Sequence, residues 1–327
     1  MSRSKTLCSV IAYFLSTCGI VAFANPTPGV FSKLQTAVFK VSTERSSGTV
    51  QVGSAVLVAQ NKLVTNCHVL SWAKKIQVLR DGEHWAAKLI AADREHDLCL
   101  LDAAVPFAAI KTSNQLQIGQ EVHAAGFPGG GEFNVSCGMV RALHEHDAAK
   151  VIQTNANFAP GASGGGLFDV EGNLVGILTF RASRGGDFHF VMPAQWVDAL
   201  VARADAKQSE SNSANAFYQR VPGKQPYFLQ AAALEALQDW PGLLAVAQRW
   251  NSVQTDNAES WMAIGKACVA MSKKEQAVSA FRQVLELNAQ HSLGKDWLLT
   301  LEPSKPCGGA ACAETQEFLA FMEPVLP

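Results

Sequence analysis

Short apolar runs separated by polar and turn residues fill the chain from about residue 31 to residue 191. Most are only a few residues long and rich in Val, Ile, Leu and Phe, which is typical of strands rather than helices. About a dozen such runs predict an all-β sandwich or a pair of barrels. The clearest runs are 50–58, 62–65, 76–79, 86–91, 98–101, 121–125, 138–143, 151–154, 166–168, 174–180 and 188–191.

The pattern becomes helical after residue 193. Pro193 opens a predicted helix over 194–203, and the polar segment that follows is rich in Ser, Asn, Ala and Gln, as in a linker. Beyond it, two segments 34 residues apart share the small and large positions of a tetratricopeptide repeat. These positions are Tyr227, Ala231, Leu234, Leu243, Ala247 and Trp250, then Trp261, Ile264, Gly265, Cys268, Ala277, Phe281 and Val284. A helix over 293–301 would cap the stack, and a plain pair of helical hairpins is the alternative.

The N-terminus predicts a secretory signal. Arg3 and Lys5 precede an apolar run over 7–22, and small residues at Ala22 and Ala24 suit cleavage after residue 24. An uncleaved anchor is the alternative, but the run is short for one, and a lipoprotein site at Cys18 is a poorer fit. We therefore expect an exported protein, periplasmic or secreted, with no stable membrane span after signal removal. The predicted order is signal peptide 1–24, β domain 30–203, linker 204–216, helical repeat domain 217–302 and tail 303–327.

Charge and composition exclude some functions. The formal net charge is −1, so nothing predicts binding to nucleic acid. Ligand-type residues alternate over 144–147, but they lack His-Glu-x-x-His spacing, so no metal site is expected. The glycines at 126–131 predict a turn between strands, and no Gly-Lys-Ser/Thr follows the glycines at 161–166, so a phosphate cradle is not expected either.

Three fragments carry the chemistry of an activated nucleophile. His68 follows an apolar run, Asp97 precedes another, and Ser163 lies in the glycine turn 161–166. Serine needs a neighbouring base, and a carboxylate can orient that base and stabilise its cationic form. Asp97 enters a run without polar residues, where a carboxylate needs a partner. The order His, Asp, Ser is that of chymotrypsin-type double barrels.

The turn around Ser163 also suits an oxyanion hole. Gly161 and Gly164 let the backbone bend so that successive N–H groups converge on one point. Donors in that arrangement stabilise the anionic intermediate of acyl transfer. A flexible Gly/Ser loop is the alternative interpretation.

Taken together, these motifs resemble the protease domain of the HtrA (Deg) branch of trypsin-like serine proteases, over about residues 48–203. The fragments that carry the resemblance are Gly53-Ser54-Ala55, Val64-Thr65-Asn66-Cys67-His68-Val69, His96-Asp97-Leu98-Cys99-Leu100-Leu101, Gln153-Thr154-Asn155-Ala156, Gly161-Ala162-Ser163-Gly164-Gly165, Gly172-Asn173-Leu174-Val175-Gly176-Ile177 and Phe190-Val191-Met192-Pro193.

The resemblance implies an all-β chymotrypsin-like double barrel, here followed by an all-α tetratricopeptide-like helical repeat domain in place of a PDZ domain. It implies His68 as general base, Asp97 as orienting residue and Ser163 as nucleophile. The N–H groups of Gly161 and Ser163 would form the oxyanion hole. Thr65 matches the family's hydroxyl residue three positions before the histidine, and Thr179 matches the one beside the buried aspartate, so both are expected to bond to Asp97.

The sequence departs from the family in several places. Ala162 stands where Asn usually precedes the nucleophile, and Gly166 replaces a common Pro or Ala. Cys67 and Cys99 also stand where the family usually has other residues. Neither of the first two changes affects the three catalytic candidates. Because the tetratricopeptide-like part replaces the PDZ domain, the family's regulation and oligomeric state do not carry over safely.

The substrate pocket is predicted from the same alignment of motifs. Asn157 stands six residues before Ser163, where trypsin-like specificity places an acid, and Phe158, Thr179, Phe180 and Arg181 are the other predicted wall residues. A pocket without an anion and with an Arg nearby favours small or medium apolar side chains.

Six cysteines follow the predicted signal, and an even number of cysteines in an exported protein permits disulfides. Cys67 and Cys99 each lie beside a triad candidate and are one possible pair, two buried free thiols being the alternative. Cys307 and Cys312 are a second candidate pair.

The sequence therefore predicts an exported serine endopeptidase that acts on protein or peptide substrates and needs no cofactor. The helical domain is predicted to serve a protein partner. The alternative is a catalytically silent protease fold that acts as a binding or chaperone-like module.

Overall fold

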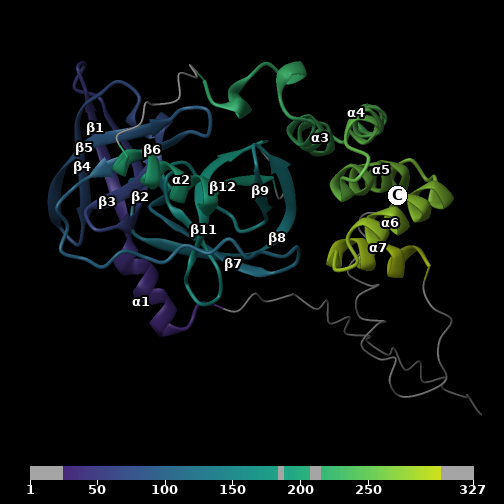
Figure 1. Ribbon diagram of the computed structural model, residues 1–327, viewed down its shortest axis with the longest axis horizontal. Coiled ribbons are helices and arrows are strands. Elements are labelled where there is room, and N and C mark those ends of the chain that lie inside the picture. The colour runs from purple at the N-terminus through teal and green to yellow at the C-terminus, as the bar shows by residue number, and fades with distance from the viewer. Residues whose placement is uncertain (1–24, 183–187, 207–214, 303–327) are drawn as a thin grey trace, which may run out of the picture. The chain divides into compact units, whose positions relative to one another are not determined.

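The computed structural model describes residues 25–182, 188–206 and 215–302 (Figure 1). The predicted signal peptide, most of the predicted linker and the tail with Cys307 and Cys312 lie outside the described residues. Within those described ranges, no helix is both long and apolar enough to cross a membrane.

Two closed six-stranded barrels form the first part of the chain, in the order β1-β2-β3-β6-β5-β4 and β10-β11-β12-β9-β8-β7. The first contains β1 (Val38–Arg45), β2 (Val50–Ala59), β3 (Lys62–Asn66), β4 (Ala73–Arg80), β5 (Glu83–Asp93) and β6 (Leu98–Asp102). The second contains β7 (Glu121–Gly126), β8 (Asn134–His146), β9 (Ala149–Thr154), β10 (Gly166–Phe168), β11 (Leu174–Arg181) and β12 (His189–Pro193). The predicted double barrel is confirmed.

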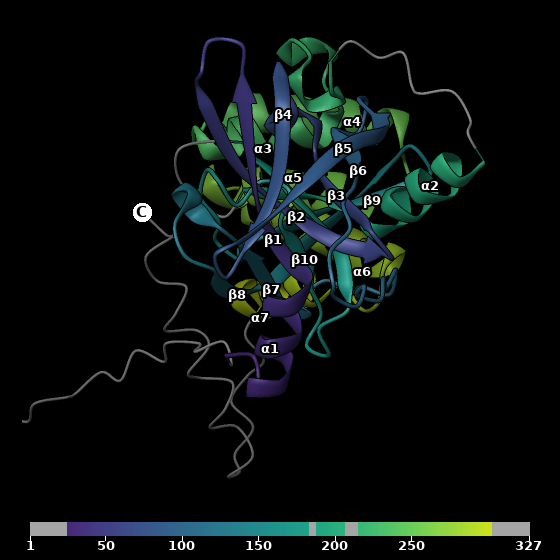
Figure 2. The same cartoon turned by 90° about the vertical axis from the view of Figure 1, so that its left-hand side faces the viewer.

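The start of this part differs from the prediction. A helix, α1 (Pro28–Ala37), occupies the beginning of the segment that was expected to be all-β, and β1 follows it directly (Figure 2). Thr27 caps the helix by accepting a hydrogen bond from the Val30 N–H at 3.3 Å, and Pro28 stands at the first helical position. Both are start signals for a helix.

Each barrel has an apolar interior made by alternate residues of its strands. Phe39, Leu57, Leu63 and Leu101 are completely buried in the first barrel. In the second, Ile152, Leu167 and Val191 are among the buried residues of the corresponding cluster. These packed interiors hold the strand ends, and the loops between them, in fixed positions.

The rest of the described chain is helical. Helix α2 (Ala194–Asp205) follows β12 as predicted, and later come α3 (Tyr227–Ala236), α4 (Trp240–Val253), α5 (Ala258–Ala270), α6 (Lys274–Leu287) and α7 (Ser292–Leu301). Consecutive helices from α3 to α7 pack against one another. Of the predicted repeat positions, Cys268, Ala277 and Phe281 are buried, whereas Trp261 is only half-buried.

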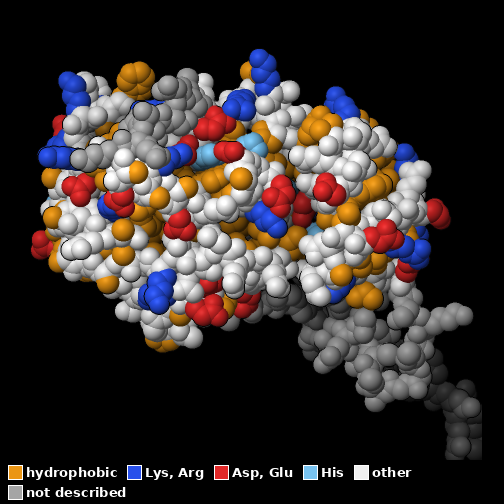
Figure 3. Space-filling view, viewed as in Figure 1, with side chains coloured by type: hydrophobic (Ala, Val, Ile, Leu, Met, Phe, Trp, Pro, Cys, Tyr) orange, Lys and Arg blue, Asp and Glu red, His pale blue; other side chains and the backbone are white. Residues whose placement is uncertain are grey.

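Charged side chains of both signs are interspersed on the face seen in Figure 3. Hydrophobic side chains lie between them, and no broad patch of one sign covers that face. This distribution agrees with the near-zero net charge of −1.

Candidate active site

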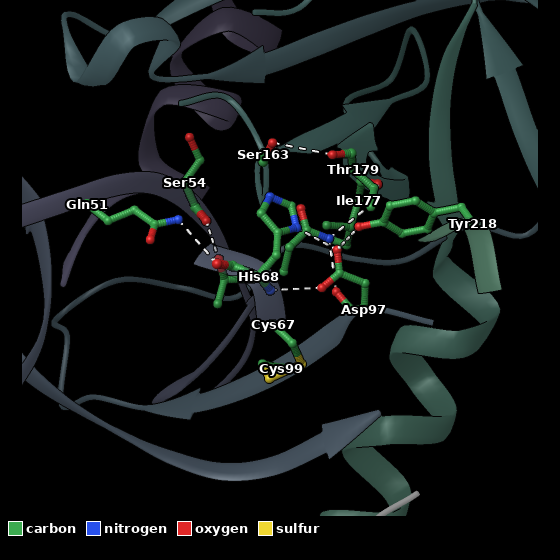
Figure 4. Close-up of polar contacts among 12 residues, drawn as sticks. Gln51, Ser54, Cys67, His68, Asp97, Cys99, Ser163, Ile177, Thr179 and Tyr218 are labelled. Atoms are coloured by element: carbon green, nitrogen blue, oxygen red, sulfur yellow. Dashed lines mark hydrogen bonds and ion pairs between the residues drawn. A yellow bond between two sulfur atoms is a disulfide. The ribbon is translucent and has the colours of Figure 1, made fainter. Parts of the chain in front are cut away.

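His68 and Asp97 come together at the edge of the first barrel. His68 lies in the short 3-10 helix η1 (Cys67–Leu70) after β3, and Asp97 immediately precedes β6. The Nδ1 atom of His68 lies 2.6 Å from Oδ2 of Asp97, and the backbone N–H of His68 donates to Oδ1 at 2.9 Å. Figure 4 shows the imidazole between Asp97 and Ser163. The Asp97 side chain is only 4% exposed, so the carboxylate is held on both oxygens in a nearly dry position.

A tight turn presents Asp97 to the histidine. Asp97 has φ of 57°, in the left-handed region, and its N–H donates to the Arg94 carbonyl at 3.3 Å. Asp93 stabilises the turn because its carboxylate accepts hydrogen bonds from His96 and from Arg203 of α2. Burial would raise the pKa of Asp93, but these partners outweigh burial and hold that pKa at about 2. The turn is therefore fixed by a charged group at neutral pH.

Ser163 lies in the glycine turn of the second barrel, just before β10. Gly161 has φ of 95°, and a Cβ there would lie 2.7 Å from the Gly129 nitrogen. Gly164 has φ of 86°, and a Cβ there would lie 2.0 Å from the Ser54 carbonyl oxygen. Only glycine suits either position, so the bend predicted from the sequence has a steric basis.

The turn leaves two backbone donors free. Within the described part of the chain, the N–H groups of Gly161 and Ser163 have no hydrogen-bond acceptor. The carbonyl of Pro160 accepts a hydrogen bond from Gly129 at 2.7 Å. Because a trans peptide directs its C=O and N–H to opposite sides, this bond fixes the direction of the Gly161 N–H. Gly129 belongs to η2 (Pro128–Gly130), the turn between β7 and β8.

The Ser163 hydroxyl has a local partner. It donates to the carbonyl of Thr179 on β11 at 3.3 Å (Figure 4). No hydrogen bond joins Ser163 to His68 among the residues that the structure describes. Nucleophile–base bonds are often long before substrate arrives, so this geometry does not remove Ser163 from a triad.

The expected bonds from two threonines to Asp97 are not present. The Thr65 hydroxyl donates to the Ser54 carbonyl at 2.7 Å, and the Thr179 hydroxyl donates to the Ile177 carbonyl at 2.8 Å. Asn66 connects this region instead, because its amide donates to the Asp97 carbonyl at 3.0 Å and to the Thr179 hydroxyl at 3.1 Å. Each threonine hydroxyl donates its hydrogen bond to a nearby backbone carbonyl instead, and residue type alone does not reveal which acceptor lies closer.

A tyrosine that the sequence analysis missed contacts Asp97, the predicted orienting residue. Tyr218 donates from its hydroxyl to Oδ2 of Asp97 at 2.6 Å. It lies in η3 (Phe217–Gln219), directly after the predicted linker. The only signal in the sequence is an aromatic pair, Phe217-Tyr218, between a polar segment and the first repeat helix.

The predicted pocket residues lie on the second barrel. Asn157 and Phe158 precede the glycine turn, and Phe158 packs on His189 with ring centroids 4.8 Å apart. Phe180 is half-buried and stacks on Phe190 at 5.0 Å, whereas Arg181 is exposed at the end of β11. The Ser136 hydroxyl donates to the backbone carbonyl of Asn157, so the side-chain amide of Asn157 takes no part in that hydrogen bond.

A disulfide joins Cys67 and Cys99. It links η1 to β6 and thus ties the segment that carries His68 to the strand that follows Asp97. Cys137 and Cys268 are free thiols. The residues with described positions include no group of three or more His, Cys, Asp or Glu side chains arranged for a metal ion. The pair His144 and His146 lies in β8, where His144 bonds to Gln153 at 2.9 Å.

Comparison with known proteins agrees with this geometry. Residues 53–177 match the trypsin-like peptidase domain family. The DegP-like probable periplasmic serine endoprotease of Hahella chejuensis is 37% identical over 158 residues, covering 46% of this chain and 34% of that protein. The periplasmic pH-dependent serine endoprotease DegQ of Escherichia coli is 35% identical over 147 residues, covering 41% of this chain and 32% of DegQ. The chain thus spans about a third of the length of these relatives.

Solved structures give the same result. The HtrA-type protease AlgW with a tripeptide has a TM-score of 0.51 and 30% identity, covering 55% of this chain and 64% of AlgW. A protease from M. tuberculosis in its active form has the same TM-score of 0.51 at 20% identity, which supports the fold alone. The first part of this chain is therefore similar to the trypsin-like peptidase domains of HtrA- and DegP-type serine endoproteases.

Proposed function

We propose that this protein is an exported serine endopeptidase that hydrolyses peptide bonds of protein substrates through an acyl-enzyme. One observation carries the proposal: His68 Nδ1 lies 2.6 Å from a buried Asp97 carboxylate, beside a glycine turn that carries Ser163. The same domain in the relatives belongs to proteins named as periplasmic serine endoproteases. That naming supports the reaction and a periplasmic location for this chain.

In the proposed reaction, the Ser163 hydroxyl leaves the Thr179 carbonyl and turns to Nε2 of His68. His68 takes the proton as Ser163 attacks the substrate carbonyl, and Asp97 stabilises the imidazolium. The free N–H groups of Gly161 and Ser163 would receive the negative oxygen. His68 then gives its proton to the leaving amine. In the second half of the reaction, His68 takes a proton from water as the water attacks the acyl-enzyme, and it returns that proton to Ser163 as the acyl group leaves. The chain supplies every group that these steps need.

For the helical part, we propose a tetratricopeptide-like repeat that binds a protein partner. The buried small and large residues at Ala277 and Phe281 support this interpretation, as does the packing of α3 to α7 in sequence order. The binding surface would be the exposed face of these helices rather than their packed interior.

The alternative is a catalytically silent protease fold that acts through its helical part. The bond from the Ser163 hydroxyl to the Thr179 carbonyl, rather than to His68, is the observation that favours it. In that case Ser163 would remain unreactive in the free protein.

A fluorophosphonate probe separates the two functions, because it labels only an activated serine. We expect stoichiometric labelling of the exported protein at Ser163, located by peptide mapping. Ser163→Ala is the matched control and should take no label. A folded wild-type protein that takes no label and cleaves no peptide library would support the silent module and contradict the protease.

A further inference from the structure

The chain returns to the active site after the second barrel and α2 are complete. Phe217 is fully buried, and its ring lies 4.5 Å from that of His146. The Phe217 N–H donates to the Glu95 carbonyl at 3.0 Å, and Arg220 pairs with the Glu95 carboxylate at 2.5 Å. Glu95 is two residues before Asp97, so η3 is fastened directly to the turn that presents the catalytic carboxylate.

Tyr218 lies at the centre of this fastened segment. Its hydroxyl donates to Oδ2 of Asp97, and both the Tyr218 oxygen and the His68 Nδ1 are 2.6 Å from that one atom. The ring stacks on Phe180 of β11, with centroids 4.0 Å apart and planes 12° apart. Figure 4 shows Tyr218 approaching Asp97 on the side away from Ser163. Stacking on Phe180 holds the Tyr218 ring in one orientation, and that orientation directs the hydroxyl to Oδ2 of Asp97.

A hydrogen bond holds the backbone of Tyr218, and a second one links its partner to α3. The Tyr218 carbonyl accepts from the Gln225 side chain at 2.6 Å, and the Gln225 carbonyl accepts from Gln230 of α3 at 2.7 Å. Burial and the negative charge of Asp97 raise the pKa of Tyr218 far above its usual value. The hydroxyl is therefore protonated at every working pH, and it acts towards Asp97 as a donor only.

We propose that Tyr218 is a positioning residue of the active site, which holds the Asp97 carboxylate in line with His68 and lowers the basicity of that histidine. The inference rests on the proposed protease function. A second donor on Oδ2 draws off part of the charge that would otherwise stabilise the imidazolium. The helical part of the chain thereby supplies one member of the hydrogen-bonded set around the triad.

Removal of the hydroxyl has a defined consequence. In Tyr218→Phe the ring still stacks on Phe180, so the protein should fold, but Oδ2 keeps only the bond to His68. More negative charge then faces the imidazole, and His68 holds its proton more tightly. Other charges nearby are Arg94, which lines the hollow beside His68, and the Glu95–Arg220 pair; this variant changes none of them.

The first test compares Tyr218→Phe with Tyr227→Phe on the full-length protein. Tyr227 begins α3, and among the described residues its hydroxyl has no hydrogen-bond partner, so it is a matched hydroxyl deletion. We expect kcat of Tyr218→Phe to fall about tenfold, as for a charge-assisted hydrogen bond, with KM changed little. The lower apparent pKa in the pH profile of kcat/KM should rise by about half a unit or more. Tyr227→Phe should match wild type.

The second test needs no turnover. In Ser163→Ala protein, NMR titration of the imidazole C–H signals gives the pKa of His68, with the signal assigned by its loss in His68→Gln. Tyr218→Phe should raise that pKa, and Tyr227→Phe should not. An unchanged His68 pKa overturns the proposal. A raised pKa in a protein that neither takes the serine label nor cleaves peptides would support the role of Tyr218 while contradicting the protease function.

Discussion

The hydroxyl of Ser54, on β2 of the first barrel, donates to the carbonyl of Gly161 in the glycine turn of the second barrel at 2.9 Å. The same oxygen accepts from the buried Phe127 N–H at 3.0 Å, and the Ser54 N–H donates to the Ser163 carbonyl at 2.8 Å. One serine thus connects the nucleophile turn to the opposite barrel and to the turn after β7. The orientation of the N–H groups proposed to form the oxyanion hole therefore depends on contacts between the barrels.

Ser54→Ala tests this connection. The variant removes the bond to Gly161 and leaves the Phe127 N–H without its acceptor, which costs about 1–3 kcal/mol. We expect a folded protein with a lower melting temperature and kcat/KM reduced roughly tenfold, because the turn is held less firmly. Ser47→Ala is the control, since Ser47 is exposed and bonds only to Thr49. Equal kcat/KM in the two variants would show that Ser54 does not support the turn.

The triad prediction follows from the way its members act as a unit. Ser163→Ala and His68→Ala should each reduce peptide hydrolysis by roughly three or more orders of magnitude. The double variant should be little worse than either single one, because each change already removes the activated nucleophile. Steady-state turnover of a fluorogenic peptide, with circular dichroism to verify folding, measures this. Wild-type turnover in Ser163→Ala would exclude Ser163 as the nucleophile.

The disulfide between Cys67 and Cys99 should stabilise the first barrel. The two residues are 32 positions apart, and closing a loop of that length reduces the conformational entropy of the unfolded chain, which destabilises the unfolded state by about 4 kcal/mol. Paired Cys67→Ala and Cys99→Ala substitutions should therefore lower the free energy of unfolding by about 2–4 kcal/mol. Denaturant titration measures it, with Cys137→Ala as the control because Cys137 is a free thiol.

Redox conditions give a check on that prediction without substitution. Reductant should destabilise the wild type and leave the paired variant unchanged. Peptide mapping of the isolated protein without reductant that finds both thiols free would contradict the prediction.

The strand pattern predicted a sandwich or a pair of barrels, and the order of the motifs with the resemblance to HtrA-branch proteases implied the double barrel and the pairing of His68 with Asp97. Strand periodicity fixes which residues face each core, and Asp97 needed a partner because it enters an apolar run. The role of Tyr218 had no such signal. It depends on where a segment 121 residues further along the chain packs, and neither periodicity nor motif spacing encodes that. The predicted bonds from Thr65 and Thr179 to Asp97 are absent for a related reason, because the acceptor of each hydroxyl depends on backbone positions that only the folded chain sets.

Substrate preference should follow the uncharged pocket residues. Asn157 and Phe158 provide no anion to pair with a basic side chain, and Arg181 at the end of β11 would repel one. Cleavage should therefore follow small or medium apolar residues. A peptide-library profile measures the preference, and Arg181→Ala should admit more basic residues than the wild type. A wild-type profile dominated by Arg and Lys would contradict the assignment.

His144 should make stability depend on pH. Burial lowers its pKa below the ordinary 6.5; Glu259, the hydrogen bond to Gln153 and Glu235 oppose this shift only in part, and Lys266 adds to it. The neutral ring bonds to Gln153 and stacks on Phe228 of α3, with centroids 4.5 Å apart. Below pH 6.5 His144 is protonated in the unfolded chain but stays neutral in the folded protein. The stability that depends on the neutral ring is therefore fully present above that pH and is lost as the pH falls.

The free energy of unfolding, measured by denaturant from pH 8 to pH 5, should therefore decrease below about pH 6.5, by at most about 1.4 kcal/mol per pH unit for this one group. His144→Phe keeps an aromatic ring against Phe228 and removes the titration, so its pH dependence should be weaker than that of the wild type. His84→Phe is the control, because His84 is exposed on β5. His123 and His146, whose pKa values are also lowered by burial, remain in both variants, so the difference between them isolates His144. Equal slopes would mean that His144 takes up its proton in the folded protein as readily as in the unfolded chain.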